Sequence, residues 1–253
     1  MALGFRQGEI LAILRAEGRV AVEDLARRFD VTLQTIRRDL GDLAEAGYLD
    51  RVHGGAVARA GVANIAYESR RRLNEVGKAA IGRACAALIP DNASLILNLG
   101  TTTEAVARDL VNHRNLTVIT NNMNVATILL ANPDCEIMVA GGALRRSDGG
   151  LVGDLTTAFF EQFKVDWAVI GASGIDPDGD LLDFDLAEVR VSRAILGRAR
   201  QKVVVADHSK IGRSAPGRIA GLAEVDVLVT DAPLPDRLAR ACEGWGTRVL
   251  VAG

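Results

Sequence analysis

The chain has 253 residues, of which 49% are hydrophobic and 25% charged, so it is long enough for one small and one medium-sized globular domain. Its formal net charge is −2, and residues 1–60 carry nine basic and nine acidic side chains, so bulk charge argues weakly against a nucleic-acid partner. The three cysteines are far apart, which argues against disulfides and zinc, and the lack of a long apolar run or a signal-peptide core favours a cytoplasmic protein without a membrane partner.

Short helical segments and turns fill the first sixty residues. Apolar residues at helical spacing predict a helix over residues 6–16, and a short extended segment precedes a second helix that ends near Phe29. After a tight turn, Thr32 is a candidate N-cap for a third helix. Two short strands flank His53 and its neighbouring glycines. This order predicts a winged helix-turn-helix domain over residues 1–58.

The third helix is amphipathic. With 3.6 residues per turn, Ile36, Leu40 and Leu43 form an inward stripe, and basic and polar side chains lie on the opposite side. The N-terminal residues of such a helix reach base edges in the major groove, where arginine binds guanine and glutamine binds adenine. A solvated charged face is the alternative. The candidate DNA-binding residues are Thr32, Gln34, Thr35, Arg37, Arg38, Arg51 and His53.

The segment AVEDLARRFDVTLQTIRRDLGDLAEAGYLDRVHGGA resembles the N-terminal signature of the DeoR family of bacterial transcriptional regulators. Its TIRRDL and HGGA motifs are highly specific to that family. Thr32 stands where the family more often has serine, and both residues cap helices. The resemblance implies operator DNA as a partner.

Residues 59–72 lose the periodicity and indicate a linker, in which Arg70, Arg71 and Arg72 either contact DNA phosphates or are solvated. Short apolar runs then alternate with helix-like segments, as in strands buried on both faces of a sheet. We therefore expect a mostly parallel α/β domain over residues 73–253 that binds an effector and forms a homodimer or homotetramer. The predicted strands are residues 94–97, 116–119, 137–140, 167–171, 203–206, 225–229 and 249–252.

The segment SLILNLGTTTEAVARDL indicates a strand, a glycine turn and a helix. Gly100 permits the tight turn, and the three threonines present amides and hydroxyls at the helix N-terminus. This arrangement holds a phosphate without a P-loop lysine. An ordinary helix cap has the same pattern and is the alternative.

Polar clusters also follow other predicted strands, including Asp207 and Ser209, and ligands of open α/β sheets lie beyond the carboxyl ends of strands. Lys78 is either a second cation or a solvated surface lysine. The acidic residues either accept hydrogen bonds from ligand hydroxyls or only favour a helix start. The candidate effector-binding residues are Lys78, Gly100, Thr101, Thr102, Thr103, Thr120, Asn121, Asn122, Gly141, Gly142, Asp183, Asp185, Glu188 and Lys210.

The order of these segments resembles the effector domain of the DeoR family, whose fold is related to ribose-5-phosphate isomerase. That enzyme carries a lysine in a glycine-rich run after an acidic strand end. The corresponding stretch here, GIDPDGDLLDFDLAEVR, has no lysine, and added aspartates oppose the negative charge of an enediolate. We therefore expect a pocket that binds a phosphorylated molecule without catalysis, metal or cofactor. A phosphosugar isomerase and a protein-interaction adaptor are the alternatives.

Three segments, NHRNLTVITNNMNVATIL, GGALRRSDGGLVGD and GIDPDGDLLDFDLAEVRVSRAI, resemble the family members that regulate glycerol 3-phosphate metabolism. The resemblance implies a repressor that glycerol 3-phosphate releases from DNA. A different sugar phosphate remains an alternative effector.

Overall fold

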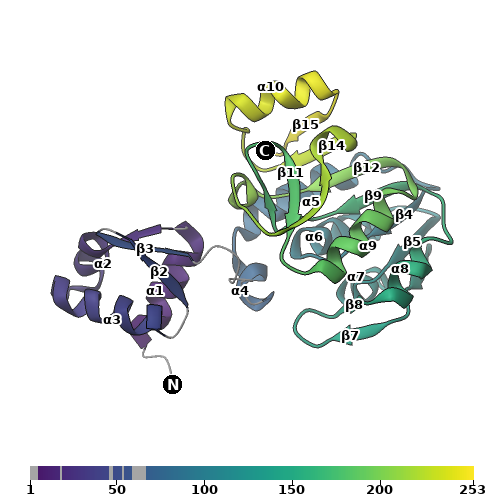
Figure 1. Cartoon of the computed structure of the whole chain (residues 1–253). Helices are drawn as coiled ribbons and strands as arrows, with labels where there is room; N and C mark the ends of the chain where they lie inside the picture. The colour runs from purple at the N-terminus through teal and green to yellow at the C-terminus, as the bar shows by residue number, and fades with distance from the viewer. Residues whose placement is uncertain (1–4, 18, 46–47, 53, 59–66) are drawn as a thin grey trace. The chain divides into compact units, whose positions relative to one another are not determined.

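The computed structural model describes residues 5–17, 19–45, 48–52, 54–58 and 67–253. It divides into two compact units, Met1–Ile65 and Ala66–Gly253, which we consider separately (Figure 1). Within the described ranges no helix is both long and apolar enough to span a membrane.

The N-terminal unit combines three helices with a three-stranded antiparallel sheet of order β1-β3-β2. The strand pairing places β1 beside β3, so the short extended segment before the second helix completes the sheet. This is the expected winged helix-turn-helix arrangement. The elements are α1 (Phe5–Glu17), β1 (Arg19–Ala21), α2 (Val22–Phe29), α3 (Leu33–Glu45), β2 (Leu49–Val52) and β3 (Gly55–Ala58).

The turn between α2 and α3 has the geometry that its sequence predicts. Asp30 adopts φ 51°, a left-handed conformation that ends α2, and aspartate tolerates it better than most side chains. Thr32 Oγ1 accepts a hydrogen bond from the Thr35 amide at 3.2 Å, which confirms the N-cap. The apolar stripe of α3 is fully buried in the core of the unit, which fixes the helix and leaves its opposite side to solvent.

The C-terminal unit is built on a seven-stranded sheet of order β15-β14-β12-β9-β4-β5-β6, in which every neighbouring pair is parallel. This confirms the predicted parallel α/β domain. The strands are β4 (Ser94–Leu97), β5 (Leu116–Thr120), β6 (Cys135–Val139), β9 (Val165–Ile170), β12 (Ala199–Val205), β14 (Val227–Thr230) and β15 (Arg248–Val251).

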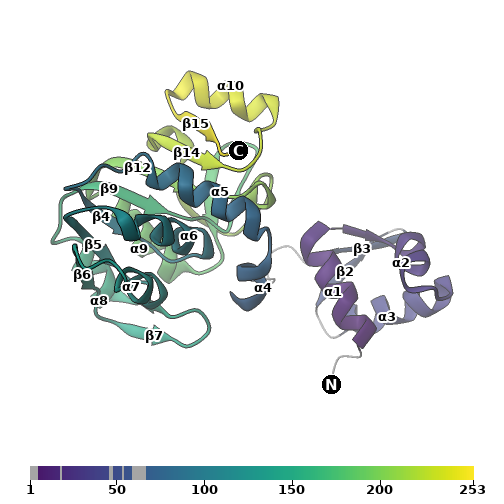
Figure 2. The same ribbon diagram turned by 180° about the vertical axis from the view of Figure 1, so that it is seen from behind.

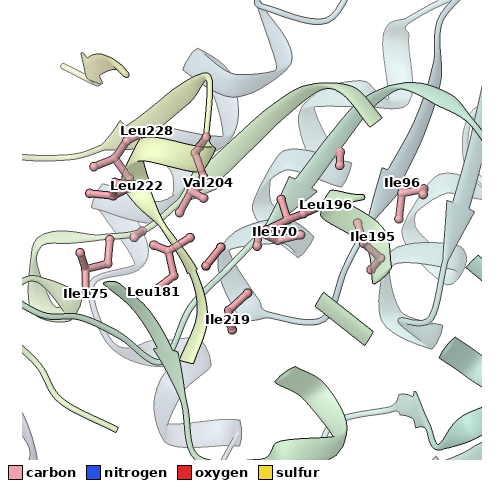
Figure 3. Close-up of a cluster of buried hydrophobic side chains, with 14 of the residues drawn as sticks. Ile96, Ile170, Ile175, Leu181, Ile195, Leu196, Val204, Ile219, Leu222 and Leu228 are labelled. Carbon is pink, nitrogen blue, oxygen red and sulfur yellow. The ribbon is translucent and has the colours of Figure 1, made fainter. Parts of the chain in front are cut away.

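Helices cover both faces of this sheet (Figures 1 and 2). Along β4, Leu95 and Leu97 pack in one buried cluster and Ile96 in another, as alternation along a strand requires. Figure 3 shows Ile96 and Ile170 of the sheet in the same cluster as Ile195. One face carries α5 (Glu75–Ala86), α6 (Thr101–Asp109) and α7 (Met123–Leu129), and the other carries α8 (Asp154–Phe160), α9 (Leu186–Leu196) and α10 (Asp236–Trp245).

Several short elements were absent from the sequence prediction. Residues 67–72 of the expected linker form a helix that belongs to the C-terminal unit, so that part of the linker assignment is wrong, and residues 59–66 lie outside the described ranges. The added elements are α4 (Tyr67–Arg72), the β7 (Ala143–Arg145) and β8 (Gly150–Val152) hairpin, the antiparallel strands β10 (Gly174–Ile175), β11 (Asp180–Asp183) and β13 (Gly217–Gly221), and the 3-10 turns η1 (Leu110–Asn112), η2 (His208–Lys210) and η3 (Leu222–Glu224).

The strand order reverses direction in the middle of the sheet. The chain runs outward from β4 through β5 to β6 on one side, and from β9 through β12 and β14 to β15 on the other. Between β4 and β9 the loops at the carboxyl ends of the strands diverge, which opens a crevice. In open α/β sheets this switch point is where ligands bind.

Candidate DNA-binding face and ligand pocket

The exposed side of α3 presents the polar residues selected from the sequence. Gln34, Arg37 and Arg38 are exposed, and Thr35 is partly exposed. Arg51 of β2 lines the same shallow hollow as these side chains, so the helix and the wing share one surface. His53 lies outside the described residues. The arrangement leaves the two arginines of α3 available to a nucleic acid.

An ion pair that the sequence analysis did not predict holds α3 against α1. Arg6 Nε donates to Asp39 Oδ2 at 2.6 Å, and Asp39 is buried. A half-buried pair of this kind orients the helix, whose N-terminal half stays exposed. Asp39 directly precedes Leu40 of the apolar stripe of α3. This position beside the stripe was the available sequence signal that Asp39 is buried.

In the C-terminal unit a pocket lies at the switch point of the sheet. It encloses about 670 Å³, its open mouth included. Residues that directly follow β4, β9 and β12 meet there with residues from β11, α4, α9 and the β7–β8 hairpin. The polar side chains that line it are those of Tyr67, Arg70, Asn98, Thr101, Thr102, Glu104, Asp148, Ser173, Asp183, Glu188, Ser192 and Lys210.

The segment from β4 into α6 forms the expected strand, glycine turn and helix. Gly100 adopts φ 142°, which only glycine reaches readily, and it lines the pocket with Thr101 and Thr102. Thr103 does not line the pocket: its buried hydroxyl donates to the carbonyls of Asn98 at 2.8 Å and Gly100 at 2.7 Å. Two of the three threonines therefore line the pocket, and the third closes the turn.

Positively charged side chains gather near the N-terminus of α6. Burial, together with the neighbouring positive charge of Arg213, lowers the pKa of Lys210 to about 8. No carboxylate within the described part of the chain forms an ion pair with Lys210. Arg70 lines the same pocket. Cations held close together and partly desolvated create a site for an anion.

Carboxylates form a second charged group in the pocket. Asp183 Oδ2 accepts a hydrogen bond from Ser173 Oγ at 2.8 Å. Burial raises the pKa of Glu188 to about 7, with a further contribution from the charge of Asp183. Asp185 does not line the pocket, because its Oδ1 caps α9 by accepting from the Ala187 amide at 2.8 Å.

Arg145 of the β7–β8 hairpin connects the carboxylates, although no prediction included it. Its guanidinium pairs with Asp148 at 2.6 Å, with Asp185 at 2.7 Å and with Glu188. Burial alone lowers the pKa of Arg145, but its hydrogen bonds to Asp148 and Glu188 outweigh burial and raise it. An arginine and an aspartate inside a glycine-rich hairpin, RRSDGG, were the only sequence signal.

Lys78 is neither a second cation in the pocket nor a solvated surface lysine. It is buried, and its Nζ donates to the carbonyls of Arg70 and, at 2.6 Å, Leu73. It lines a different groove, together with Arg83 and Arg108. Lys78 therefore fixes the end of α4 to α5.

The polar residues after β5 also serve the fold and do not line the pocket. Thr120 Oγ1 donates to the Leu97 carbonyl at 2.7 Å, and Asn121 Nδ2 donates to the Leu151 carbonyl at 3.1 Å. Asn122 caps α7 through its side-chain oxygen. These bonds join β5 to β4 and to the hairpin, while the buried Asn121 Oδ1 and Asn122 Nδ2 have no hydrogen-bond partner in the described part of the chain.

Gly141 and Gly142 shape the connection between β6 and β7 and likewise do not line the pocket. The Gly141 carbonyl accepts from Thr156 Oγ1 at 2.7 Å. Gly142 adopts φ 140°, and a side chain there would collide with Thr156. The need for glycine at this place is therefore conformational.

Comparison with known proteins identifies both units. The model of the DeoR-like helix-turn-helix domain matches residues 6–60, and that of the DeoR C terminal sensor domain matches residues 73–232. A solved ribose 5-phosphate isomerase A from Methanocaldococcus jannaschii has 16% identity, a TM-score of 0.41 and a coverage of 55% of each chain.

Similar curated proteins are transcriptional repressors and not enzymes. The glycerol-3-phosphate regulon repressor of Escherichia coli is 44% identical over 230 residues, which cover 91% of each chain. Its namesake in Haemophilus influenzae is 43% identical over 91% of this chain and 90% of that protein. The repressor CsqR of Escherichia coli is 39% identical over 89% and 87%. The chain therefore belongs to the DeoR family of transcriptional regulators, with a DNA-binding helix-turn-helix domain followed by a sensor domain.

Proposed function

We propose that this regulator represses genes of glycerol 3-phosphate metabolism and that glycerol 3-phosphate, bound in the switch-point pocket, releases it from operator DNA. The observation that carries this proposal is the charge distribution of the pocket. Arg70, Lys210 and the N-terminus of α6 line it together with the carboxylates Glu104, Asp148, Asp183 and Glu188. A small molecule with a phosphate at one end and hydroxyls at the other satisfies both groups.

The phosphate is expected at the start of α6. Backbone amides at a helix N-terminus point at an anion, and the helix dipole favours negative charge there. Thr101 and Thr102 add hydroxyl donors, and Lys210 adds a positive charge. A phosphate also favours the charged form of Lys210, because the anion opposes the burial that lowers its pKa.

The hydroxyls are expected at the carboxylates. Asp183 and Glu188 line the pocket and can accept hydrogen bonds from two adjacent hydroxyls, while Ser173 holds Asp183 in place. Charge-assisted bonds of this type are about twice as strong as neutral ones. The names of the similar repressors support glycerol 3-phosphate as the molecule that has both features.

DNA binding is assigned to α3 and the wing. Because residues 1–60 carry equal numbers of basic and acidic side chains, a single unit has a small non-specific electrostatic attraction to DNA. Two units joined through their sensor domains gain affinity by avidity. We therefore place a homodimer or homotetramer on paired half-sites, and the ligand changes the spacing of its recognition helices.

A thermal-shift panel on the full chain tests the ligand. Glycerol 3-phosphate at about one hundred times its Kd stabilises the protein by about 2.7 kcal/mol through mass action, and glycerol and inorganic phosphate at the same concentration stabilise it less. Lys210→Gln removes the shift and keeps binding to DNA selected from a random pool, whereas the exposed Lys164→Gln retains both. A larger shift with ribose 5-phosphate or a fructose phosphate would reassign the effector.

A further inference from the structure

Helix α4 lies at the pocket and begins the C-terminal unit. Tyr67 and Arg70 both line the pocket. In sequence, α4 directly follows residues 59–66, which connect the two units. Its position makes it the first structured element of the sensor domain that the chain reaches from the DNA-binding unit.

We infer that Arg70 binds the phosphate of the ligand. To do so its side chain leaves Asp148, and this change of partner moves α4. Pocket occupancy then reaches the segment that leads to the DNA-binding unit. This inference rests on the proposed function, because it requires an anionic ligand in the pocket. It adds a binding residue and the route by which binding is transmitted.

Arg70 is held weakly by its protein partners. Its Nη2 is 3.5 Å from Asp148 Oδ2, and its buried Nε has no hydrogen-bond partner in the described structure. The side chain is only 20% exposed, so water does not fully replace the missing bonds. A guanidinium has five donors in a planar fork that matches a phosphate, and most of them are unused here.

Asp148 does not depend on Arg70. Arg145 donates to both oxygens of Asp148, from Nε at 2.9 Å and from Nη2 at 2.6 Å. When Arg70 leaves, the Asp148 carboxylate keeps this bidentate pair and no buried charge is left alone. The exchange therefore replaces one long contact of Arg70 with short, charge-assisted bonds to phosphate.

The two ends of α4 are attached differently. At its C-terminal end, Lys78 Nζ donates to the carbonyls of Arg70 and Leu73, which fixes the backbone to α5. At its N-terminal end, Tyr67 donates its hydroxyl to Glu104 of α6 at 2.9 Å. The C-terminal end is held through its backbone and the Tyr67 end only through side-chain bonds, so a new bond at the Arg70 side chain displaces the Tyr67 end more readily.

The Tyr67 end also shares its hydrogen bonds with the hairpin. Asn124 Nδ2 donates to Tyr67 Oη at 3.1 Å and to the Asp148 carbonyl at 2.9 Å. Asn124 thus links Tyr67 to the hairpin whose Asp148 contacts Arg70, so both positions of α4 that line the pocket adjoin the same hairpin. The end of the helix that adjoins residues 59–66 is the end that moves.

Calorimetric titration of the full chain with glycerol 3-phosphate tests the binding role. We expect Arg70→Gln to weaken binding about 10- to 100-fold, the effect of losing one charge-assisted partner, and Arg70→Lys to restore part of it. Release from DNA shifts to higher ligand concentration by the same factor. Arg71→Gln is the matched control, because Arg71 is exposed and lines another groove, and it binds like the unsubstituted chain.

Hydrogen exchange of the unsubstituted chain tests the movement without any variant. Glycerol 3-phosphate changes exchange of the peptide covering residues 67–72 severalfold, and glycerol at the same concentration does not. If the chain binds the ligand but exchange there is unchanged, or if folded Arg70→Gln binds as tightly as Arg71→Gln, the inference is overturned. If the unsubstituted chain gives no heat with glycerol 3-phosphate, the proposed function fails first and the inference fails with it.

Discussion

The two units of this regulator arrange their functional side chains in opposite ways. In the N-terminal unit, Arg37 and Arg38 are exposed on a helix that an apolar core holds from behind. In the sensor domain, Arg145 and Glu188 are largely buried and bound to other charged residues before any ligand arrives. A surface that recognises DNA needs hydrogen-bond donors exposed to solvent. A pocket that changes conformation on binding needs internal bonds that a ligand can replace.

The largest expected effect tests the dependence of the DNA-binding face on its core. Leu40 is fully buried beneath α3, and Leu40→Ala should lower the free energy of unfolding of the N-terminal unit by about 3–4 kcal/mol. Urea unfolding measures the loss. Leu33→Ala, on the exposed side of the same helix, is the control and should cost less than 1 kcal/mol. Equal losses of unfolding free energy in the two variants would show that the DNA-binding face does not depend on this core.

The next effect tests whether ion pairs organise the sensor pocket. Arg145→Ala removes the cation that three carboxylates share, and we expect the stability of the sensor domain to fall by about 3 kcal/mol. The melting temperature should drop by several degrees and recover partly at acidic pH, where the carboxylates are protonated. The exposed neighbour Arg146→Ala should melt like the unsubstituted chain. A pH-independent loss would point to packing instead of charge.

A smaller effect is expected at the DNA-binding face. Arg38→Ala should reduce operator affinity by about 2 kcal/mol, roughly thirtyfold, if its guanidinium contacts a base. Gel-shift titration at fixed salt gives the value, and thermal stability should not change because Arg38 is exposed. Arg240→Ala, an exposed arginine of the other unit, should bind as before. An unaltered affinity for Arg38→Ala would remove α3 from the interface.

The smallest effect concerns pH. Burial raises the pKa of Glu188 to about 7 from an ordinary 4.5, so the folded sensor domain takes up a proton that the unfolded chain has lost. This contribution to stability is complete below pH 4.5 and disappears as pH rises through 7. Glu188→Gln should flatten the dependence of the free energy of unfolding on pH between pH 5 and pH 8. Parallel curves for the two proteins would contradict this assignment.

The sequence predicted the DNA-binding unit well because its signals are local. The 3.6-residue spacing of Ile36, Leu40 and Leu43 places Arg38 outside, and Thr32 caps the helix that it precedes. The parallel sheet was equally readable, since strands buried on both faces are continuous apolar runs.

The ligand pocket was predicted only in part. Gly100 and Lys210 were found because they follow strands whose carboxyl ends meet, and Asp183 was found through the resemblance of its segment to the isomerase. Arg70 and Arg145 were not, since their segments are short and their role depends on distant partners. Thr103, Thr120 and Asn122 were expected at the ligand but bond to the backbone, and a polar residue at a strand end gives the same signal in both cases.

The strand pairing of the two units has a consequence for biosynthesis. In the first sheet Val20 pairs with Ala56, so the DNA-binding unit is complete once the ribosome has released its opening segment. In the second sheet, β4 cannot pair with β9 until the ribosome has made β9, and Ser94 bonds to Asp166 across 72 residues. Local contacts form early and distant ones late. The DNA-binding unit thus folds before the sensor domain, and nascent chains pass through a stage in which the sensor domain is not yet folded.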